Sequence, residues 1–239
     1  MIISFGSINI TIEMTLNTLL NDGDTISAYH NQTEIGGNAA LQAIAAARCG
    51  GKVALIGMIG DDLFGEKIIT TLRREGIHTT GIAKQTETQT DIATSLIQAD
   101  NRIKHIKTEN NLEYLKHEQI PPNHLNERGM VLLQDDVPTT LRTEILNQAK
   151  SNGTKSILTY EKNIENRSES NADITLKRTD YHFEETSFNC YCGTLAACLQ
   201  AGLAQEQAEH YAKTAANLTQ KHGTGYKALP YIDEIENNL

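Results

Sequence analysis

Aromatic residues are scarce in this chain of 239 residues, which contains no tryptophan and only four phenylalanines. A hydrophobic core must therefore be built from isoleucine, leucine, valine and alanine, in a chain long enough to need no disulfide or metal for support. No apolar run approaches the ~18 residues that indicate a membrane-spanning helix. No lysine and arginine cluster is present to bind nucleic acid, and the formal net charge is −9. The composition predicts neither membrane nor nucleic-acid partners.

The first residues, MIISFGSINI, show a strand pattern and carry neither the basic segment nor the cleavage site of a signal peptide. We therefore expect a cytoplasmic protein with reduced cysteines. Cys190, Cys192 and Cys198 form a C-x-C-x5-C motif that could suggest a metal site. However, helical residues two positions apart do not share a face, and no nearby histidine completes a four-ligand set. We expect buried thiols that fill gaps in a packed helix, and no metal.

Hydrophobic periodicity and glycine positions predict an alternation of strands and helices. The predicted strands are residues 1–12, 25–34, 52–59, 90–98, 103–107, 130–134, 156–160 and 174–176. The predicted helices are residues 39–49, 63–75, 139–151, 187–201, 205–220 and 231–238. Such alternation is typical of an α/β fold with a mostly parallel sheet.

Two stretches fit a buried parallel sheet poorly because they are polar. These are residues 12–34 and 90–107, and we expect them to form a separate small β-sheet over one end of the molecule. The segment 161–171, EKNIENRSESN, has the composition of a loop. No internal repeat or low-complexity linker divides the chain, so we expect a single domain over residues 1–239.

Five motifs, in order along nearly the whole chain, carry a family resemblance. They are GSIN at 6–9, the segment 36–82 that begins GGNAAL, VLLQDDVP at 131–138, ADITLKRTD at 172–180, and EETSFNCYCGTLAACLQAGL at 184–203. Together they resemble the ribokinase-like (PfkB) family of carbohydrate kinases. The resemblance implies a three-layer α/β/α sandwich with a small β lid. It also implies ATP- and magnesium-dependent transfer of phosphate to a hydroxyl of a sugar or nucleoside.

The same resemblance assigns a role to several positions. It places the catalytic residue at Asn189, where the family has an aspartate. It places substrate binding at Asn9, Thr11, Gly36, Gly37, Asn38, Leu41 and Asp136. It places nucleotide or anion binding at Thr186, Ser187, Phe188, Lys177, Asp180 and Gly223. Family members often pair through the lid, which implies a homodimer whose contacts are the exposed strands at 25–34 and 90–98.

The chain departs from the family pattern where the chemistry takes place. An amide at Asn189 cannot accept the hydroxyl proton as a carboxylate would. Thr11 and Leu41 stand where the family has a sugar-binding aspartate and asparagine. The glycine turn that approaches the phosphate becomes Thr186 to Phe188. The segment that normally separates the last two motifs is missing, since Asp180 and Glu184 are almost adjacent.

These departures favour a relative that keeps the fold but has weak or lost kinase activity. In that case it serves as a sugar- or metabolite-binding protein or as a protein-interaction scaffold. A second interpretation is an active kinase in which Asp180, Glu184 or Glu185 replaces the base. A third is a different enzyme with Cys190 or Cys192 as nucleophile, near His182 and a helix N-terminus that can lower a thiol pKa.

Overall fold

The computed structural model describes residues 1–100, 102–108, 111–161 and 171–239. Its centre is a parallel sheet with the strand order β10-β9-β8-β1-β4-β5. The strands are β1 (Ile2–Phe5), β4 (Val53–Gly60), β5 (His78–Gln85), β8 (Met130–Gln134), β9 (Lys155–Tyr160) and β10 (Ile174–Lys177). β1, β4, β8 and β9 are apolar and almost wholly buried, as expected for strands covered on both faces.

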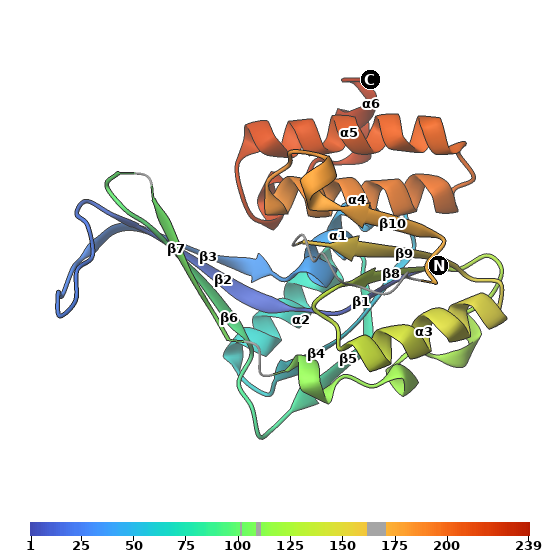
Figure 1. The fold of residues 1–239 in the computed structure, drawn as a ribbon, viewed down its shortest axis with the longest axis horizontal. Coiled ribbons are helices and arrows are strands. Elements are labelled where there is room, and N and C mark those ends of the chain that lie inside the picture. The colour runs from blue at the N-terminus through green and yellow to red at the C-terminus, as the bar shows by residue number, and fades with distance from the viewer. Residues whose placement is uncertain (101, 109–110, 162–170) are drawn as a thin grey trace.

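Helices cover both faces of this sheet and complete three layers (Figure 1). One face packs against α1 (Asn38–Arg48), α2 (Leu63–Arg74), α4 (Glu185–Gln200) and α5 (Gln205–His222), with the short α6 (Ile232–Glu236) outside. The other face packs against α3 (Thr139–Ser151) and the short 3-10 segments η1 (Leu112–Tyr114), η2 (His117–Gln119) and η3 (Pro122–His124). No helix within the described part of the chain has the length and apolarity to cross a membrane.

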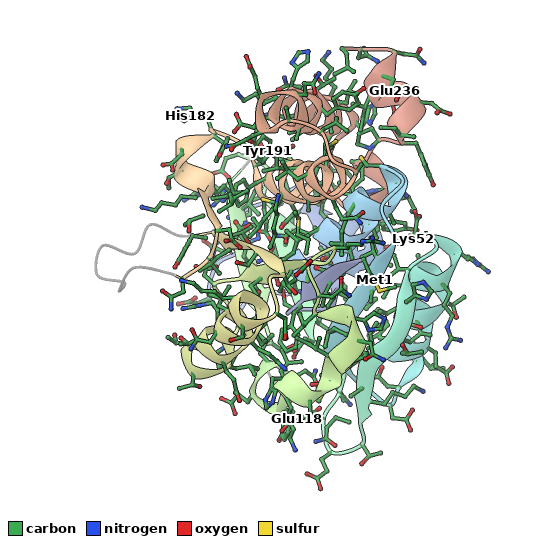
Figure 2. All side chains as sticks on the ribbon, turned by 90° about the vertical axis from the view of Figure 1, so that its right-hand side faces the viewer. Met1, Lys52, Glu118, His182, Tyr191 and Glu236 are labelled. Atoms are coloured by element: carbon green, nitrogen blue, oxygen red, sulfur yellow. The ribbon has the colours of Figure 1, made fainter. Side chains whose placement is uncertain are left out.

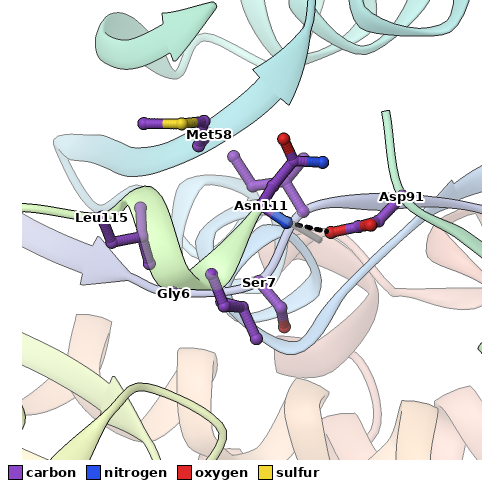
Figure 3. Close-up of a pocket in the computed structure, with 8 residues that line it drawn as sticks. Gly6, Ser7, Met58, Asp91, Asn111 and Leu115 are labelled. Carbon is purple, nitrogen blue, oxygen red and sulfur yellow. Dashed lines mark hydrogen bonds between the residues drawn. The ribbon is translucent and has the colours of Figure 1, made fainter. Parts of the chain in front are cut away.

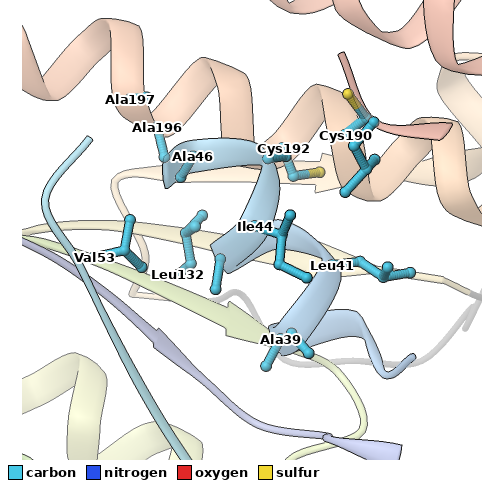
Figure 4. Packing of buried hydrophobic residues seen from close by; sticks show 14 of the residues in the cluster. Ala39, Leu41, Ile44, Ala46, Val53, Leu132, Cys190, Cys192, Ala196 and Ala197 are labelled. Carbon is cyan, nitrogen blue, oxygen red and sulfur yellow. The ribbon is translucent and has the colours of Figure 1, made fainter. Parts of the chain in front are cut away.

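Small residues bring α1 and α4 unusually close together (Figure 4). Alanines fill the α1 surface, and Ala196, Ala197 and Cys192 face them from α4. Gly193 lies at the closest point, where a Cβ would clash with the carbonyl oxygen of Gln42 and lie 2.8 Å from the Cβ of Ala45. The absence of a side chain at residue 193 therefore sets the distance between the two helices.

A second sheet projects from one end of the body (Figure 1). It contains β2 (Asn9–Leu16), β3 (Ala28–Gly36), β6 (Ile92–Ile97) and β7 (Ile103–Lys107), in the order β3-β2-β6-β7. Pairing of β2 with β6 is parallel, and the other two pairings are antiparallel. This is the small polar sheet expected from residues 12–34 and 90–107, although it begins at Asn9.

The structure corrects four details of the sequence prediction. Residues 1–12 form two strands, β1 and β2, which lie in different sheets. Strand β5 was not predicted, because its sequence HTTGIAKQ is polar and lies on the edge of the sheet. Strand β6 lies in the interior of the second sheet. The edge strands of this sheet are therefore β3 and β7, and not the strand predicted at 90–98. Helix α4 begins at Glu185, two residues earlier than expected. The loop predicted at 161–171 lies largely outside the described residues.

Replacement of Gly193 tests the close approach of α1 and α4. We expect Gly193→Ala to lower the free energy of unfolding by about 1–3 kcal/mol, because overpacking outweighs the gain in helix propensity of roughly 1 kcal/mol. Urea denaturation measures the change. Asn217→Ala is a matched control, since Asn217 is exposed on α5. There the gain in helix propensity should raise the free energy of unfolding. A Gly193→Ala variant as stable as the control would contradict the packing argument.

Candidate functional site

A hollow lies where the second sheet meets the body. Four of the predicted substrate-binding residues line it, namely Asn9, Gly37, Asn38 and Asp136. The remaining lining residues are Ser7, Ile8, Asp91, Lys107, Thr108, Leu112 and Glu185. Several polar groups converge on it, as they do at small-molecule sites.

A smaller hollow of about 160 Å³ shares Ser7, Ile8, Asp91 and Leu112 with the first one. Figure 3 shows this second hollow between Met58 of β4 and the segment around Leu115. Because four residues line both hollows, we treat the two as one site and call it the pocket.

Local backbone geometry explains why α1 begins at the pocket. Gly37 has a φ of 95°, and a Cβ there would lie 2.8 Å from the Cα of Ile8. Glycine is the residue that adopts this conformation readily. The main-chain N–H of Asn38 donates to the Ser7 hydroxyl at 3.0 Å. The turn between β1 and β2 and the start of α1 therefore fix each other.

Behind the pocket, a chain of buried amide side chains connects α1, α4 and β8. Nδ2 of Asn189 donates to Oδ1 of Asn38 at 2.9 Å and to the carbonyl oxygen of Glu185 at 3.1 Å. Its Oδ1 accepts from Nε2 of Gln42 at 2.8 Å. Oε1 of Gln42 in turn accepts from Nε2 of Gln134 at 2.9 Å. We call Asn38, Gln42, Gln134 and Asn189 the amide network.

The network joins the pocket through Asn38, whose Nδ2 donates to Oδ2 of Asp136 at 3.4 Å. Asn189 itself is fully buried and does not line the pocket. Both of its N–H groups donate to acceptors that cannot donate in return. The position to which the resemblance assigns the catalytic carboxylate therefore carries a fixed structural amide.

Three predicted substrate-binding residues do not line the pocket. Leu41 is buried in the core, and Thr11 bonds its neighbour Asn9 at 3.4 Å. Gly36 pairs with Asn9 across β2 and β3, where a side chain would collide with both Asn9 and Thr11. Thr11 and Gly36 belong to the second sheet at the edge of the site, and Leu41 belongs to the core.

The predicted nucleotide-binding residues lie in α4, at or just after the end of β10, and in the loop after α5. Ser187 and Phe188 are buried inside α4, and Lys177, Asp180 and Gly223 are exposed. The hydroxyl of Thr186 accepts from the main-chain N–H of Gly225 at 3.4 Å. None of the six lines the pocket. The bond between Thr186 and Gly225 brings the loop after Gly223 next to the start of α4.

The short connection that replaces the missing segment packs tightly against α4. Tyr181 lies 4.7 Å from Tyr191 and 5.9 Å from Phe188, measured between ring centroids, and it also stacks on Phe183. Figure 2 shows Tyr191 inside this region and His182 at its outer surface. Nη1 of Arg178 donates to the carbonyl oxygen of Phe183 at 3.4 Å. We call Tyr181, Phe183, Phe188 and Tyr191 the aromatic cluster.

The cysteines lie in surroundings that suppress reactivity. Burial raises the pKa of the Cys190 thiol to about 12 and that of Cys192 well above its usual value. The thiolate is the nucleophile, so these shifts oppose the interpretation of either residue as a nucleophile. Within the described residues, no group of three histidine, cysteine or acidic side chains could hold a metal ion.

One buried carboxylate was not anticipated from the sequence. Glu161, directly after β9, has Oε2 2.9 Å from Nε of Arg178. Burial, and then the nearby Glu185, raise the pKa of Glu161 to about 8, against the opposing effect of Arg178. The position is one residue beyond a buried strand, which is the only signal in the sequence that could have indicated it.

Other site residues were missed because they come from unrelated parts of the chain. Asp91 and Lys107 belong to the second sheet, and Lys107 Nζ lies 3.8 Å from Oε1 of Glu185 on α4. Gln42 and Gln134 occupy positions in a helix and a strand that otherwise read as apolar. A glutamine within such a run was the available signal for a buried polar network.

Comparisons with known proteins agree with this architecture. A family described as pfkB family carbohydrate kinase matches residues 1–178. The ribokinase of Bacillus subtilis (strain 168) is 29% identical over 154 residues, which cover 64% of this chain and 53% of the relative. The chain thus spans about half the length of the curated relatives it matches.

Two solved structures are similar over nearly their whole length. The Arabidopsis thaliana ribokinase complexed with ribose and ATP superposes with a TM-score of 0.82 at 18% identity, covering 99% of this chain and 97% of that one. The ribokinase of Thermotoga maritima gives a TM-score of 0.82 at 19% identity, covering 99% and 98%. At these identities the likeness shows the fold.

The amide network predicts that an aspartate is not tolerated at residue 189. In Asn189→Asp, the oxygens of Asn38 and Glu185 would lose their donors and face a buried carboxylate. We expect a loss of stability of about 1–3 kcal/mol for each unsatisfied group, measured by urea denaturation. Asn217→Asp, at an exposed position of α5, should change little. Equal stability of the two variants would show that the network does not require an amide.

Proposed function

We propose that this chain, which belongs to the pfkB family of carbohydrate kinases, binds a small polyhydroxylated molecule without efficient phosphate transfer to it. The ligand is a sugar or a nucleoside. The observation that carries the proposal is the state of Asn189, which is buried and fixed by three hydrogen bonds at the position of the family's catalytic acid.

The first support is the chemistry of that position. Transfer of phosphate to a hydroxyl benefits from a group that accepts the hydroxyl proton, a contribution of typically about 10²–10⁴ in rate. An amide oxygen that already accepts from Gln42 cannot take this role. The reaction would lose this contribution even if both substrates were bound.

The second support concerns ATP and magnesium, which the family implies. The start of α4 carries Glu184 and Glu185, whose charges oppose a nucleotide phosphate. The Thr186 hydroxyl already accepts a hydrogen bond from the main-chain N–H of Gly225, and Phe188 lies in the aromatic cluster. Although the solved Arabidopsis ribokinase holds ribose and ATP, the described residues here do not fit a bound Mg-ATP.

The third support is that polar groups suited to a sugar are present at the pocket. Asn9, Asn38 and Asp136 present amide and carboxylate groups to it, which suit hydroxyl groups. One observation favours the alternative of residual kinase activity, since Glu185 lines the pocket and is half exposed. Asp180 and Glu184, the other two suggested bases, do not line it.

The expected partner is a second copy of the chain, bound through the second sheet. Side chains alternate between the faces of a strand. One face carries Glu13, Glu34 and Lys107, which contact the body through Thr224, Lys227 and Glu185. The opposite face, which we call the outer face, carries Met14, Leu96 and Ile106. Ile106 is exposed, whereas Met14 and Leu96 are half-buried. An apolar face of this kind favours association.

Ligand binding tests the proposed function directly. In a thermal-shift assay, D-ribose should raise the melting temperature, because a ligand at 100 times its Kd stabilises by about 2.7 kcal/mol. Mg-ATP should give no shift, and no ADP should form with D-ribose present. Asp136→Asn should weaken the effect of D-ribose. Asp22→Asn, in an exposed turn of the second sheet, is the matched control and should not.

Other outcomes separate the alternatives. ATP binding together with turnover that Glu185→Gln abolishes would establish a rearranged kinase and overturn the proposal. If sugars and nucleosides both fail to bind the folded wild-type protein, the small-molecule function is wrong and the scaffold interpretation takes its place.

The outer face predicts how the second copy is held. We expect the wild-type protein to be a dimer by light scattering after size exclusion, and Leu96→Lys to be a monomer, because two outer faces cannot bury two charges. Gln32→Lys places the same charge on the opposite face and should leave the dimer intact. A monomeric wild type, or equal effects of both variants, would contradict the arrangement.

A further inference from the structure

Asp91 is the carboxylate that the sequence analysis did not assign to any role. It lies immediately before β6, is 6% exposed, and lines both hollows of the pocket. Figure 3 shows it at the pocket opposite Asn111, whose main-chain N–H donates to Oδ2 of Asp91 at 3.1 Å. A buried acidic side chain is costly unless polar groups surround it.

The strand register places Asp91 beside Asn9. Ile10 pairs with Ile92 in the parallel ladder of β2 and β6, and the N–H of Ile10 donates to the carbonyl oxygen of Asp91 at 2.9 Å. Asp91 is therefore the neighbour of Asn9 on the adjacent strand, on the face of the second sheet that also carries Thr11. The second sheet thus has a carboxylate directly before β6, beside the amide of Asn9 and on the same face as the hydroxyl of Thr11.

A set of hydrogen bonds fixes this carboxylate in place. Besides the N–H of Asn111, the hydroxyl of Thr108 donates to Oδ1 of Asp91 at 3.2 Å. Asn111 is itself anchored, because its Oδ1 accepts from the Thr88 hydroxyl at 2.7 Å and its Nδ2 donates to the carbonyl oxygen of Gln89 at 2.8 Å. These bonds hold the Asp91 carboxylate at the edge of the pocket.

The charges around the pocket favour ligands without an anionic group. Asp91 and Asp136 both line it, and Glu185 is matched by Lys107 at 3.8 Å. The pocket therefore has an excess of negative charge. Carboxylates accept hydrogen bonds from hydroxyl groups, whereas a phosphate next to them is repelled.

From these observations we infer that Asp91 is a specificity-determining residue, which binds a hydroxyl group of the ligand and selects uncharged polyols over their phosphate esters. The inference rests on the proposed function, because it names the group within the same pocket that recognises the ligand. It assigns part of ligand recognition to the second sheet and therefore requires this sheet to stay close to the body.

The test compares D-ribose with D-ribose 5-phosphate by isothermal titration calorimetry. The wild type should bind D-ribose at least about tenfold more tightly than the phosphate ester. Asp91→Asn should weaken D-ribose binding by ~10- to 100-fold, the range for a hydrogen bond to a charged group. Binding of the phosphate ester should weaken less, so that the ratio of the two affinities falls. A merely structural effect would weaken the binding of both ligands equally.

Thr88→Val is the matched control. It removes the anchor of Asn111 and so loosens the same loop, but it leaves the carboxylate unchanged, and Thr88 lines neither hollow. This variant should keep the wild-type ratio of affinities. If the wild type binds D-ribose and Asp91→Asn keeps both affinities or their ratio, the role of Asp91 is wrong while the proposed function stands. If the wild type binds neither sugar, the proposed function itself fails.

Discussion

The buried amide network is the interaction on which the rest of the site depends. It connects α1, α4 and β8 through side chains that are fully or almost fully buried, and Gln42 also reaches Thr159 of β9 at 3.3 Å. Buried polar groups cost free energy unless they are paired, so each member restricts the others to one arrangement. The close packing around Gly193 allows the network to form, because it brings α4 against the backbone of α1 at Gln42.

This constraint is the physical basis of the proposed loss of efficient phosphate transfer. The amide at Asn189 satisfies groups that a carboxylate would leave without a donor, and it therefore stabilises the interior. In a catalytic site, the same position must present a reactive group to the substrate. The stability of the core and the catalytic requirement make opposite demands on this residue, as is common at functional sites.

The second sheet is coupled to the body by charged and polar contacts near the pocket. The carboxylate of Glu34 is buried and lies 2.7 Å from Nζ of Lys227, while Lys107 approaches Glu185. A buried charge that loses its partner is strongly destabilising. Separation of the second sheet from the body would therefore cost free energy unless water hydrated the Glu34 carboxylate. The outer face, with Met14, Leu96 and Ile106, is the surface proposed to bind a second copy of the chain.

The sequence alone determined the alternation of helices and strands, the polar second sheet and the family to which the chain belongs, because these depend on local periodicity and on glycine and proline positions. It also indicated that Asn9, Gly37, Asn38 and Asp136 lie together at one site. Only the tertiary structure separated Thr11, Leu41 and residues 186–189 of α4 from the pocket. Only it brought Asp91 and Lys107 to the pocket and Gln134 to the amide network behind it. The physical reason is that hydrogen bonds between residues about 100 positions apart, such as that between Gln42 and Gln134, leave no periodic pattern in the sequence. Their partners are chosen by the way the helices pack on the sheet.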